Sequence, residues 1–257
     1  MNELLDLAVL AGNLASKEIL KHYDKFEVYT KQDKSPLTTA DIAANDIIMA
    51  TLEKSGIKIC SEESVLRADE RMSADSFWLI DPLDGTKEFI AQNGEFCVCI
   101  ALIKHGRPIL SAIAIPVTGE IFYSKGENIV YKNGEILPKI SKTPNLFLLG
   151  RHGNPIKRYQ IAEKFGFEFA RVGSAIKFCR LSENKAASYG RFSKCSLWDI
   201  AAGDFLVEQS GGITLDLTTG AKPLYNTQSL ETNPYISLDR NNIHLLDKIV
   251  QAIKEKL

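Results

Sequence analysis

The 257-residue chain is 45% hydrophobic and 25% charged, which is typical of a globular protein with one large domain or two closely joined lobes. Its 31 basic and 32 acidic side chains give a formal net charge of −1, so no overall positive charge attracts nucleic acid or anionic lipid. The longest apolar stretch beyond the N-terminal segment, at 97–117, is broken by Lys104 and Arg107 and predicts a hairpin. We therefore expect neither a nucleic-acid partner nor a membrane span.

The N-terminal segment and the cysteines indicate a cytoplasmic protein. Residues 3–22 have helical apolar periodicity, and Glu3 and Asp6 stand where a signal peptide would be basic, so an amphipathic helix is expected. The five cysteines are odd in number, lie in apolar surroundings and form no Cys-x-x-Cys pair. We therefore expect reduced thiols in the core.

The first half of the chain predicts two helices followed by a mainly antiparallel sheet. Helical periodicity covers residues 3–22 and 41–55. Strands bounded by Gly, Pro and charged turns are predicted at Ile57–Cys60, Phe77–Ile80, Phe96–Ile103, Pro108–Ile115 and Glu120–Tyr123.

After the turn signal Lys132-Asn133-Gly134, strands alternate with helices, which predicts an α/β lobe. The expected strands are Leu146–Leu149, Phe167–Ala170 and Ser188–Phe192. The expected helices are about Pro155–Phe165, Ala175–Asn184, Leu197–Gln209 and Asn242–Lys254. We therefore predict two lobes, residues 1–138 and residues 139–257.

Four short stretches place carboxylates where predicted elements begin or end. Three of them have simple structural explanations: Asp41 as a helix N-cap, Glu62 and Glu63 as a solvated loop, and Asp199 as the acidic partner of a capping box begun by Ser196. The fourth stretch, WLIDPLDGTKEFI, resists such an explanation, because Asp81 directly follows a buried strand and Asp84 comes only three residues later.

Two carboxylates held together at the rim of a core repel each other and are costly to desolvate unless a cation compensates. Oxygen ligands favour Mg²⁺ or Mn²⁺, and the absence of His or Cys near this motif in the sequence argues against zinc. Gly85 lets the backbone approach a ligand, and Thr86 adds a hydroxyl beside amides that suit a phosphate oxygen. This combination is what metal-assisted phosphate hydrolysis requires.

The ordered set of motifs TTAD, EE, DPLDGT and a late WD resembles the magnesium-dependent, lithium-sensitive phosphatases, which include inositol monophosphatase, fructose-1,6-bisphosphatase and 3'(2'),5'-bisphosphate nucleotidase. The resemblance covers essentially the whole chain. It implies an α/β (α+β) fold in a layered α-β-α-β-α sandwich. The first lobe would then carry most metal ligands, and the second the substrate-side residues.

Within this family, DPLDGTKEFI and the later GSAIKFC resemble the bisphosphate nucleotidase branch. That resemblance implies that a metal-activated water hydrolyses the 3'-phosphate of 3'-phosphoadenosine 5'-phosphate, giving AMP and inorganic phosphate. Two alternatives stay open. One is inositol monophosphatase or fructose-1,6-bisphosphatase activity, and the other is a non-catalytic module that binds phosphorylated metabolites or divalent ions.

The resemblance also implies roles for single residues. Asp41 and Thr86 would activate the attacking water, the amides of Gly85 and Thr86 would hold the phosphate, and Glu63 would lie just behind the metal ligands. More than one Mg²⁺ is expected, with Mn²⁺ as a possible substitute. The implied metal ligands are Glu62, Asp81, the backbone carbonyl of Leu83, Asp84 and Asp199.

Ser174 and Lys177 are the expected contacts to the nucleotide, together with Arg191 and Arg151, and Asp199 is expected to contact the substrate as well. The branch usually has Ser-Arg-Ser-His where this chain has Arg151 and His152 without either serine. The role of His152 is therefore left open. The linear pattern does not determine the oligomeric state.

Overall fold

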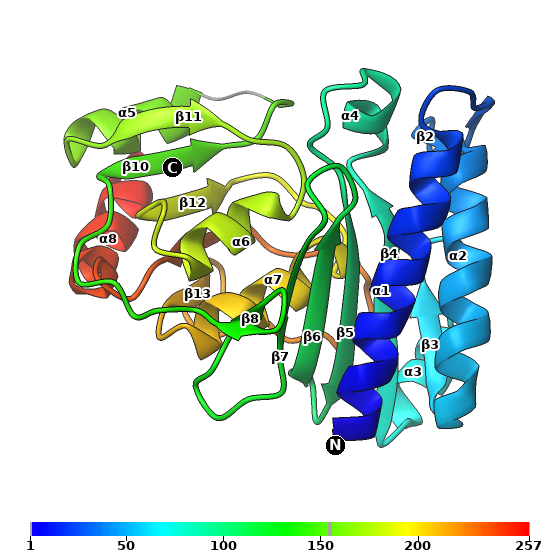
Figure 1. Cartoon of the computed structure of the whole chain (residues 1–257). Helices are drawn as coiled ribbons and strands as arrows, with labels where there is room; N and C mark the ends of the chain where they lie inside the picture. Colours follow the sequence, from blue (N-terminus) through cyan, green and yellow to red (C-terminus); the bar gives the residue numbers. More distant parts are fainter. Residues whose placement is uncertain (1, 154–155, 257) are drawn as a thin grey trace.

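Two β-sheets, one helix layer between them and a helix layer on each outer side organise the chain (Figure 1). The computed structural model describes residues 2–153 and 156–256. The predicted layered α-β-α-β-α architecture is confirmed. No helix in these two ranges is both long enough and apolar enough to cross a membrane.

The first layers come from the N-terminal half. Helices α1 (Asn2–His22) and α2 (Thr39–Leu52) lie side by side, joined by a short hairpin of β1 (Val28–Thr30) and β2 (Pro36–Thr38). The two outer helices cover a seven-stranded sheet of order β3-β4-β5-β6-β7-β8-β9, in which only the β3–β4 pair is parallel. Its strands are β3 (Lys58–Ser61), β4 (Ser76–Asp84), β5 (Cys97–Lys104), β6 (Arg107–Ile115), β7 (Glu120–Ser124), β8 (Tyr131–Lys132) and β9 (Glu135–Ile136). Between these strands lie the 3-10 turn η1 (Glu53–Ser55) and the short helices α3 (Ala68–Ser73) and α4 (Thr86–Ile90).

The C-terminal half builds a five-stranded mixed sheet of order β11-β10-β12-β14-β13. Its strands are β10 (Leu146–Leu149), β11 (Glu168–Arg171), β12 (Ser188–Arg191), β13 (Ile213–Asp216) and β14 (Tyr235–Leu238). Its helices are α5 (Ile156–Lys164), α6 (Ile176–Ser182), α7 (Trp198–Gln209) and α8 (Leu246–Lys256), the last preceded by the 3-10 turn η2 (Ile243–Leu245). The sequence predicted α5, but its expected start at Pro155 lies outside the described residues. Strands β13 and β14 were not predicted.

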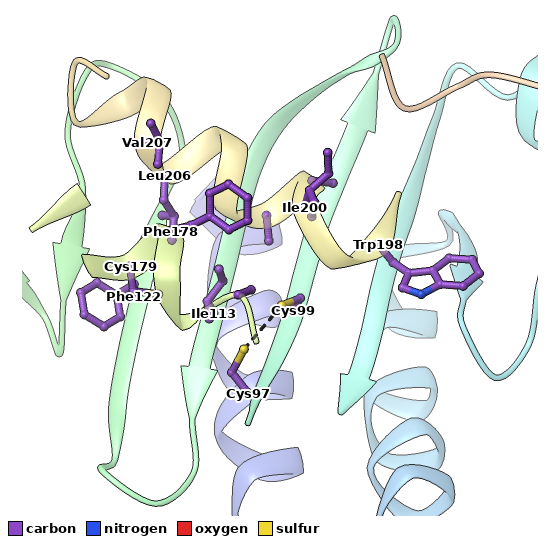
Figure 2. Packing of buried hydrophobic residues seen from close by; sticks show 14 of the residues in the cluster. Cys97, Cys99, Ile113, Phe122, Phe178, Cys179, Trp198, Ile200, Leu206 and Val207 are labelled. Atoms are coloured by element: carbon purple, nitrogen blue, oxygen red, sulfur yellow. Dashed lines mark hydrogen bonds between the residues drawn. The ribbon is translucent and has the colours of Figure 1, made fainter. Parts of the chain in front are cut away.

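Strand β4 has both faces buried, which explains its uninterrupted apolar sequence. Phe77 and Leu79 point to one side and join the core around α6 and α7. Trp78 and Ile80 point to the other side and join the core under α1 and α2. Figure 2 shows part of the inner core, where Phe178 of α6 packs beside α7. A third core joins the far face of the five-stranded sheet to α5 and α8.

The predicted division near residue 138 stays a prediction. The large sheet ends at Ile136 and the small sheet begins at Leu146, but α7 from the second half packs against β5 and β6 of the first. The helix layer is therefore shared by the two sheets.

An ion cluster ties the edge of the large sheet to α6. Arg180 Nη2 donates to Glu120 Oε2 at 2.8 Å, and Arg180 Nη1 donates to Glu183 Oε2 at 2.7 Å. Lys132 also pairs with both carboxylates. Burial opposes the charge on Glu120, but the hydrogen bonds from Arg180 and Lys132 lower its pKa to about 2.

We expect Glu120→Gln to lower the free energy of unfolding at neutral pH by about 2 kcal/mol, because Arg180 and Lys132 lose a charged acceptor. A lowered folded-state pKa contributes stability above the unfolded-state pKa of about 4.5 that is lost as the pH falls through about 2. The gap between variant and parent in urea unfolding should therefore shrink from pH 7 to pH 3. Glu127→Gln, at a carboxylate that is 59% exposed, is the control. A gap that is independent of pH would contradict the assignment.

Candidate active site

A bulge at the end of β4 aims two carboxylates at one place. Residues three apart on a regular strand point to opposite faces. Here Asp81 is paired with Cys99 and Asp84 with Cys97, so β4 has one more residue than β5 between the two pairs. Because residues paired across strands share a face, the extra residue brings Asp81 and Asp84 to the same side. The Leu83 amide donates to Asp81 Oδ1 at 3.0 Å and holds the bulge.

Two further carboxylates reach the same place from other elements. Glu62 follows β3, where its amide donates to the Ile80 carbonyl at 3.1 Å. Asp199 lies in the first turn of α7, and its Oδ2 accepts from the Ser196 amide at 3.3 Å. One ligand oxygen from each of Glu62, Asp81 and Asp199 lies within 4.8 Å of the others.

Burial and mutual repulsion disfavour the charges of this cluster. Burial, followed by the charges of Glu62 and Asp84, raises the pKa of Asp81 well above its usual range. Burial raises the pKa of Asp84 to about 6, although Lys177 opposes the rise. Burial and the charge of Asp84 raise the pKa of Asp199 to about 7. A divalent cation would offset these costs, and an all-oxygen donor set of this kind suits Mg²⁺. The residues therefore fit a metal ion.

Asp41 and Thr86 form a hydrogen-bonded pair beside the cluster. Thr86 Oγ1 donates to Asp41 Oδ1 at 3.0 Å and lies 3.3 Å from the Leu83 carbonyl oxygen. The sequence suggested Asp41 as the N-cap of α2, and this was wrong. The N-cap is Thr38, whose amide donates to Asp41 Oδ2 at 2.7 Å in a capping box. Burial raises the pKa of Asp41, and its hydrogen bonds with Thr38 limit the rise.

Gly85 makes a turn that a side chain would obstruct. Its φ of 98° lies in the left-handed region, which favours glycine. A Cβ atom at this position would lie 3.1 Å from the Glu95 carbonyl oxygen and 3.2 Å from Ser174 Cβ. The turn that presents Thr86 is therefore packed directly against the GSAIK segment of the second half.

The predicted nucleotide contacts line the same pocket, which has a volume of about 370 Å³. Lys177 is buried, donates to the Ser174 and Val172 carbonyls and lies 4.9 Å from the centre of the Tyr189 ring. The predicted site residues that line this pocket are Glu62, Asp81, Leu83, Asp84, Gly85, Thr86, Arg151, Ser174, Lys177, Arg191 and Asp199. His152, whose role the sequence left open, lines it as well.

Arg151 and His152 are engaged by carboxylates of the first half. Arg151 Nη2 donates to Glu95 Oε1 at 2.6 Å, and Glu95 Oε2 accepts from the Gly173 amide at 2.6 Å. His152 Nε2 lies 3.1 Å from Glu88 Oε1. Glu95 therefore connects Arg151 to the segment that carries Ser174. The sequence reasoning missed this link, and nothing in the linear pattern singles out Glu95.

Lys31 is a second residue that the sequence did not single out. Its Nζ lies 2.7 Å from Glu62 Oε1 and 2.6 Å from Glu63 Oε1. Burial opposes its charge, but the two carboxylates raise its pKa. Glu62 and Glu63 are accordingly not a solvated loop, because their side chains are only 26% and 13% exposed.

A cysteine lies near the acidic motif in the structure, although none is near it in the sequence. Cys97 Sγ lies 3.8 Å from Asp84 Oδ2 on the neighbouring strand. The sequence could not show this, because thirteen positions separate the two residues and the strand register brings them together.

Nearly the whole chain matches the model of a protein family. Residues 1–255 match the inositol monophosphatase family. The chain belongs to this family. A solved structure shares the fold of this chain. The inositol monophosphatase from Anabaena is 21% identical, has a TM-score of 0.79 and is aligned over 99% of this chain and 96% of that chain.

Three more similar proteins are named CysQ. The chain is 34% identical over 242 residues to "3'(2'),5'-bisphosphate nucleotidase CysQ" of Escherichia coli K12, covering 90% of this chain and 97% of that protein. The corresponding protein of Salmonella typhimurium is 36% identical over 225 residues, 81% of this chain and 91% of that one. The crystal structure of CysQ from Bacteroides thetaiotaomicron is 30% identical, with a TM-score of 0.81 over 92% of this chain and 97% of that chain.

We expect Mg²⁺ to raise the thermal unfolding midpoint of the protein, because it binds the folded carboxylate cluster and not the unfolded chain. At a concentration about 100 times its Kd, the rise should be about 5–10 °C. Asp199→Asn removes one repelling charge, so it should unfold at a higher temperature without Mg²⁺ and show little further rise with it. Asp46→Asn, at an exposed position on α2, should respond to Mg²⁺ as the parent does. An undiminished Mg²⁺ response in Asp199→Asn would refute the metal site.

Proposed function

We propose that the protein is a metal-dependent phosphomonoesterase that removes the 3'-phosphate of 3'-phosphoadenosine 5'-phosphate, giving AMP and inorganic phosphate. The observation that carries the chemistry is the Thr86–Asp41 pair, at 3.0 Å, beside three convergent carboxylates in a pocket. The choice of substrate is supported by the relatives at 34–36% identity that are named 3'(2'),5'-bisphosphate nucleotidase.

Glu62, Asp81, the Leu83 carbonyl, Asp84 and Asp199 would hold more than one Mg²⁺, for which Mn²⁺ can substitute. Bound magnesium supplies positive charge that lowers the pKa of water and offsets charge on the phosphoryl oxygens. Lys31 pairs with Glu62 and would move when Glu62 binds a metal cation. The ammonium group and the metal cation would otherwise compete for the same carboxylate oxygen.

Thr86 and Asp41 orient the attacking water and take its proton. The Thr86 hydroxyl donates to Asp41 Oδ1, so its lone pairs remain for a hydrogen bond from water. As the water oxygen attacks phosphorus, its proton passes through Thr86 to Asp41, and the bond from phosphorus to the ribose 3'-oxygen breaks. The departing 3'-oxygen takes up a proton from solvent and becomes the 3'-hydroxyl of AMP, and Asp41 later returns its proton to solvent. The buried Asp41, whose pKa is raised by burial, is suited to accept a proton.

The second half of the chain would bind the rest of the nucleotide. Lys177 and Arg191 line the pocket and add two cationic side chains to its carboxylates. They would hold the 5'-phosphate, with Ser174 nearby. The Gly85 and Thr86 amides would hold the 3'-phosphate that is hydrolysed. Arg151 and His152 stand at the rim in pairs with Glu95 and Glu88. Free cysteines in the fold agree with a cytoplasmic location.

We expect kcat/KM for Mg²⁺-dependent phosphate release to be highest with 3'-phosphoadenosine 5'-phosphate. Only this one of the three substrates offers Lys177 and Arg191 a second phosphate at the spacing found in a nucleotide. Inositol 1-phosphate and fructose 1,6-bisphosphate are compared in parallel, each with Mg²⁺ and with chelator. A preference for either sugar phosphate would replace the proposed substrate. No phosphate release from any of the three substrates would favour a binding module without catalysis.

Two variants separate metal binding from water activation. Thr86→Val should lower kcat by about 10²–10⁴-fold, the usual contribution of a positioned acid–base group, while the Mg²⁺-induced thermal shift stays. Asp84→Asn should lose both turnover and most of that shift. Thr219→Val, at an exposed turn, controls for loss of a threonine hydroxyl. Full activity in Thr86→Val would contradict the proposed role of its hydroxyl.

A further inference from the structure

Two thiols lie directly behind the carboxylate cluster. Cys97 and Cys99 alternate on β5, so their side chains point to one face, toward α6 and α7 (Figure 2). Their sulfur atoms are 3.8 Å apart, and Cys97 Sγ is also 3.8 Å from Asp84 Oδ2 and 3.5 Å from Ser174 Oγ. One donor atom from each of Asp84, Cys97 and Cys99 lies within 4.8 Å of the others.

This spacing matches the ligand spacing of a tetrahedral soft-metal centre. Two thiolates bound at about 2.3 Å to one tetrahedral ion lie about 3.8 Å apart. The two sulfur atoms already have this separation, and the carboxylate oxygen completes a donor set of two sulfurs and one oxygen. Thiolates select zinc, cadmium and similar ions over magnesium. The thiol site would therefore not bind the Mg²⁺ that the cluster of Glu62, Asp81 and Asp199 prefers.

The strand register builds this arrangement. The bulge that turns Asp81 and Asp84 to one face also places them opposite Cys99 and Cys97. Asp84 therefore lies between two environments: Oδ2 accepts from the Ala175 amide and faces Cys97, while the carboxyl group as a whole lines the pocket. Asp84 and Ser174, which both contact Cys97, also line that pocket.

We propose that Cys97, Cys99 and Asp84 form an inhibitory site for one thiophilic cation of the zinc and cadmium class. Each thiol releases its proton to water as its sulfur binds the ion. The bound ion holds Asp84 through Oδ2 and so weakens the hold of the same carboxyl group on magnesium. Binding of the thiophilic ion rests on the thiol geometry alone, whereas its inhibitory effect rests on the proposed function.

Titration of the whole protein with Cd²⁺ tests the binding. We expect an ultraviolet band from thiolate-to-cadmium charge transfer that saturates at one equivalent of Cd²⁺. Cys97→Ser and Cys99→Ala should each lose most of the band, because a hydroxyl or methyl group does not replace a thiolate for a soft ion. Cys195→Ser is the matched control, since Cys195 is the only one of the five cysteines that is not fully buried.

A band that survives in both variants, or that disappears with Cys195→Ser, would overturn the proposed site. Retention of the Mg²⁺-induced thermal shift shows that each variant is folded, and Cys99→Ala carries the test if Cys97→Ser does not fold.

The inhibitory effect is tested with magnesium. One equivalent of Cd²⁺ should raise the Mg²⁺ concentration for half-maximal phosphate release by about tenfold or more, as loss of support behind a metal ligand does elsewhere. The shift should be absent in Cys99→Ala and present in Cys195→Ser. The Mg²⁺-induced thermal shift provides the same comparison without turnover, so failure of the proposed substrate does not affect it. An unchanged Mg²⁺ requirement in the presence of the charge-transfer band would overturn inhibition.

Discussion

The candidate active site is organised around carboxylates that are buried at the end of β4 and repel one another. Asp81 and Asp84 are brought to one face by a bulge, and Asp199 is added from the start of α7. Their pKa values are all raised, because burial and neighbouring negative charge disfavour ionisation. Such an arrangement is costly unless a cation or a proton compensates, which is why this part of the core is a candidate binding site.

The surrounding structure limits the cost of these charges. Lys31 reaches Glu62 and Glu63 from the β1–β2 hairpin, and the Ala175 amide donates to Asp84 from the second half. Asp41 is used twice, because one oxygen completes the capping box of α2 and the other accepts from Thr86. The Thr86–Asp41 pair is therefore held in place by ordinary helix capping.

Contacts between the two halves give the pocket its far wall. Glu95 accepts from the Gly173 amide and pairs with Arg151, while Gly85 leaves room for Ser174. The same approach brings Cys97 within reach of Ser174 Oγ. The carboxylates, the predicted nucleotide contacts and the thiols thus meet where β4, β5 and the segment before α6 come together.

The sequence by itself determined the helices other than α3 and α4, most strands and the acidic motifs, because apolar periodicity and the strand-to-turn position of Asp81 and Asp84 are local properties. The layered fold was implied only by the resemblance of these motifs to a known family. The order of the motifs also indicated the family. It did not reveal β13 and β14, the pairing of Lys31 with Glu62 and Glu63, the Glu95 link or the thiols behind Asp84. Each of these depends on strand register or on contacts between distant segments. Register is fixed by burial of whole faces across the sheet, and only the tertiary structure decides it.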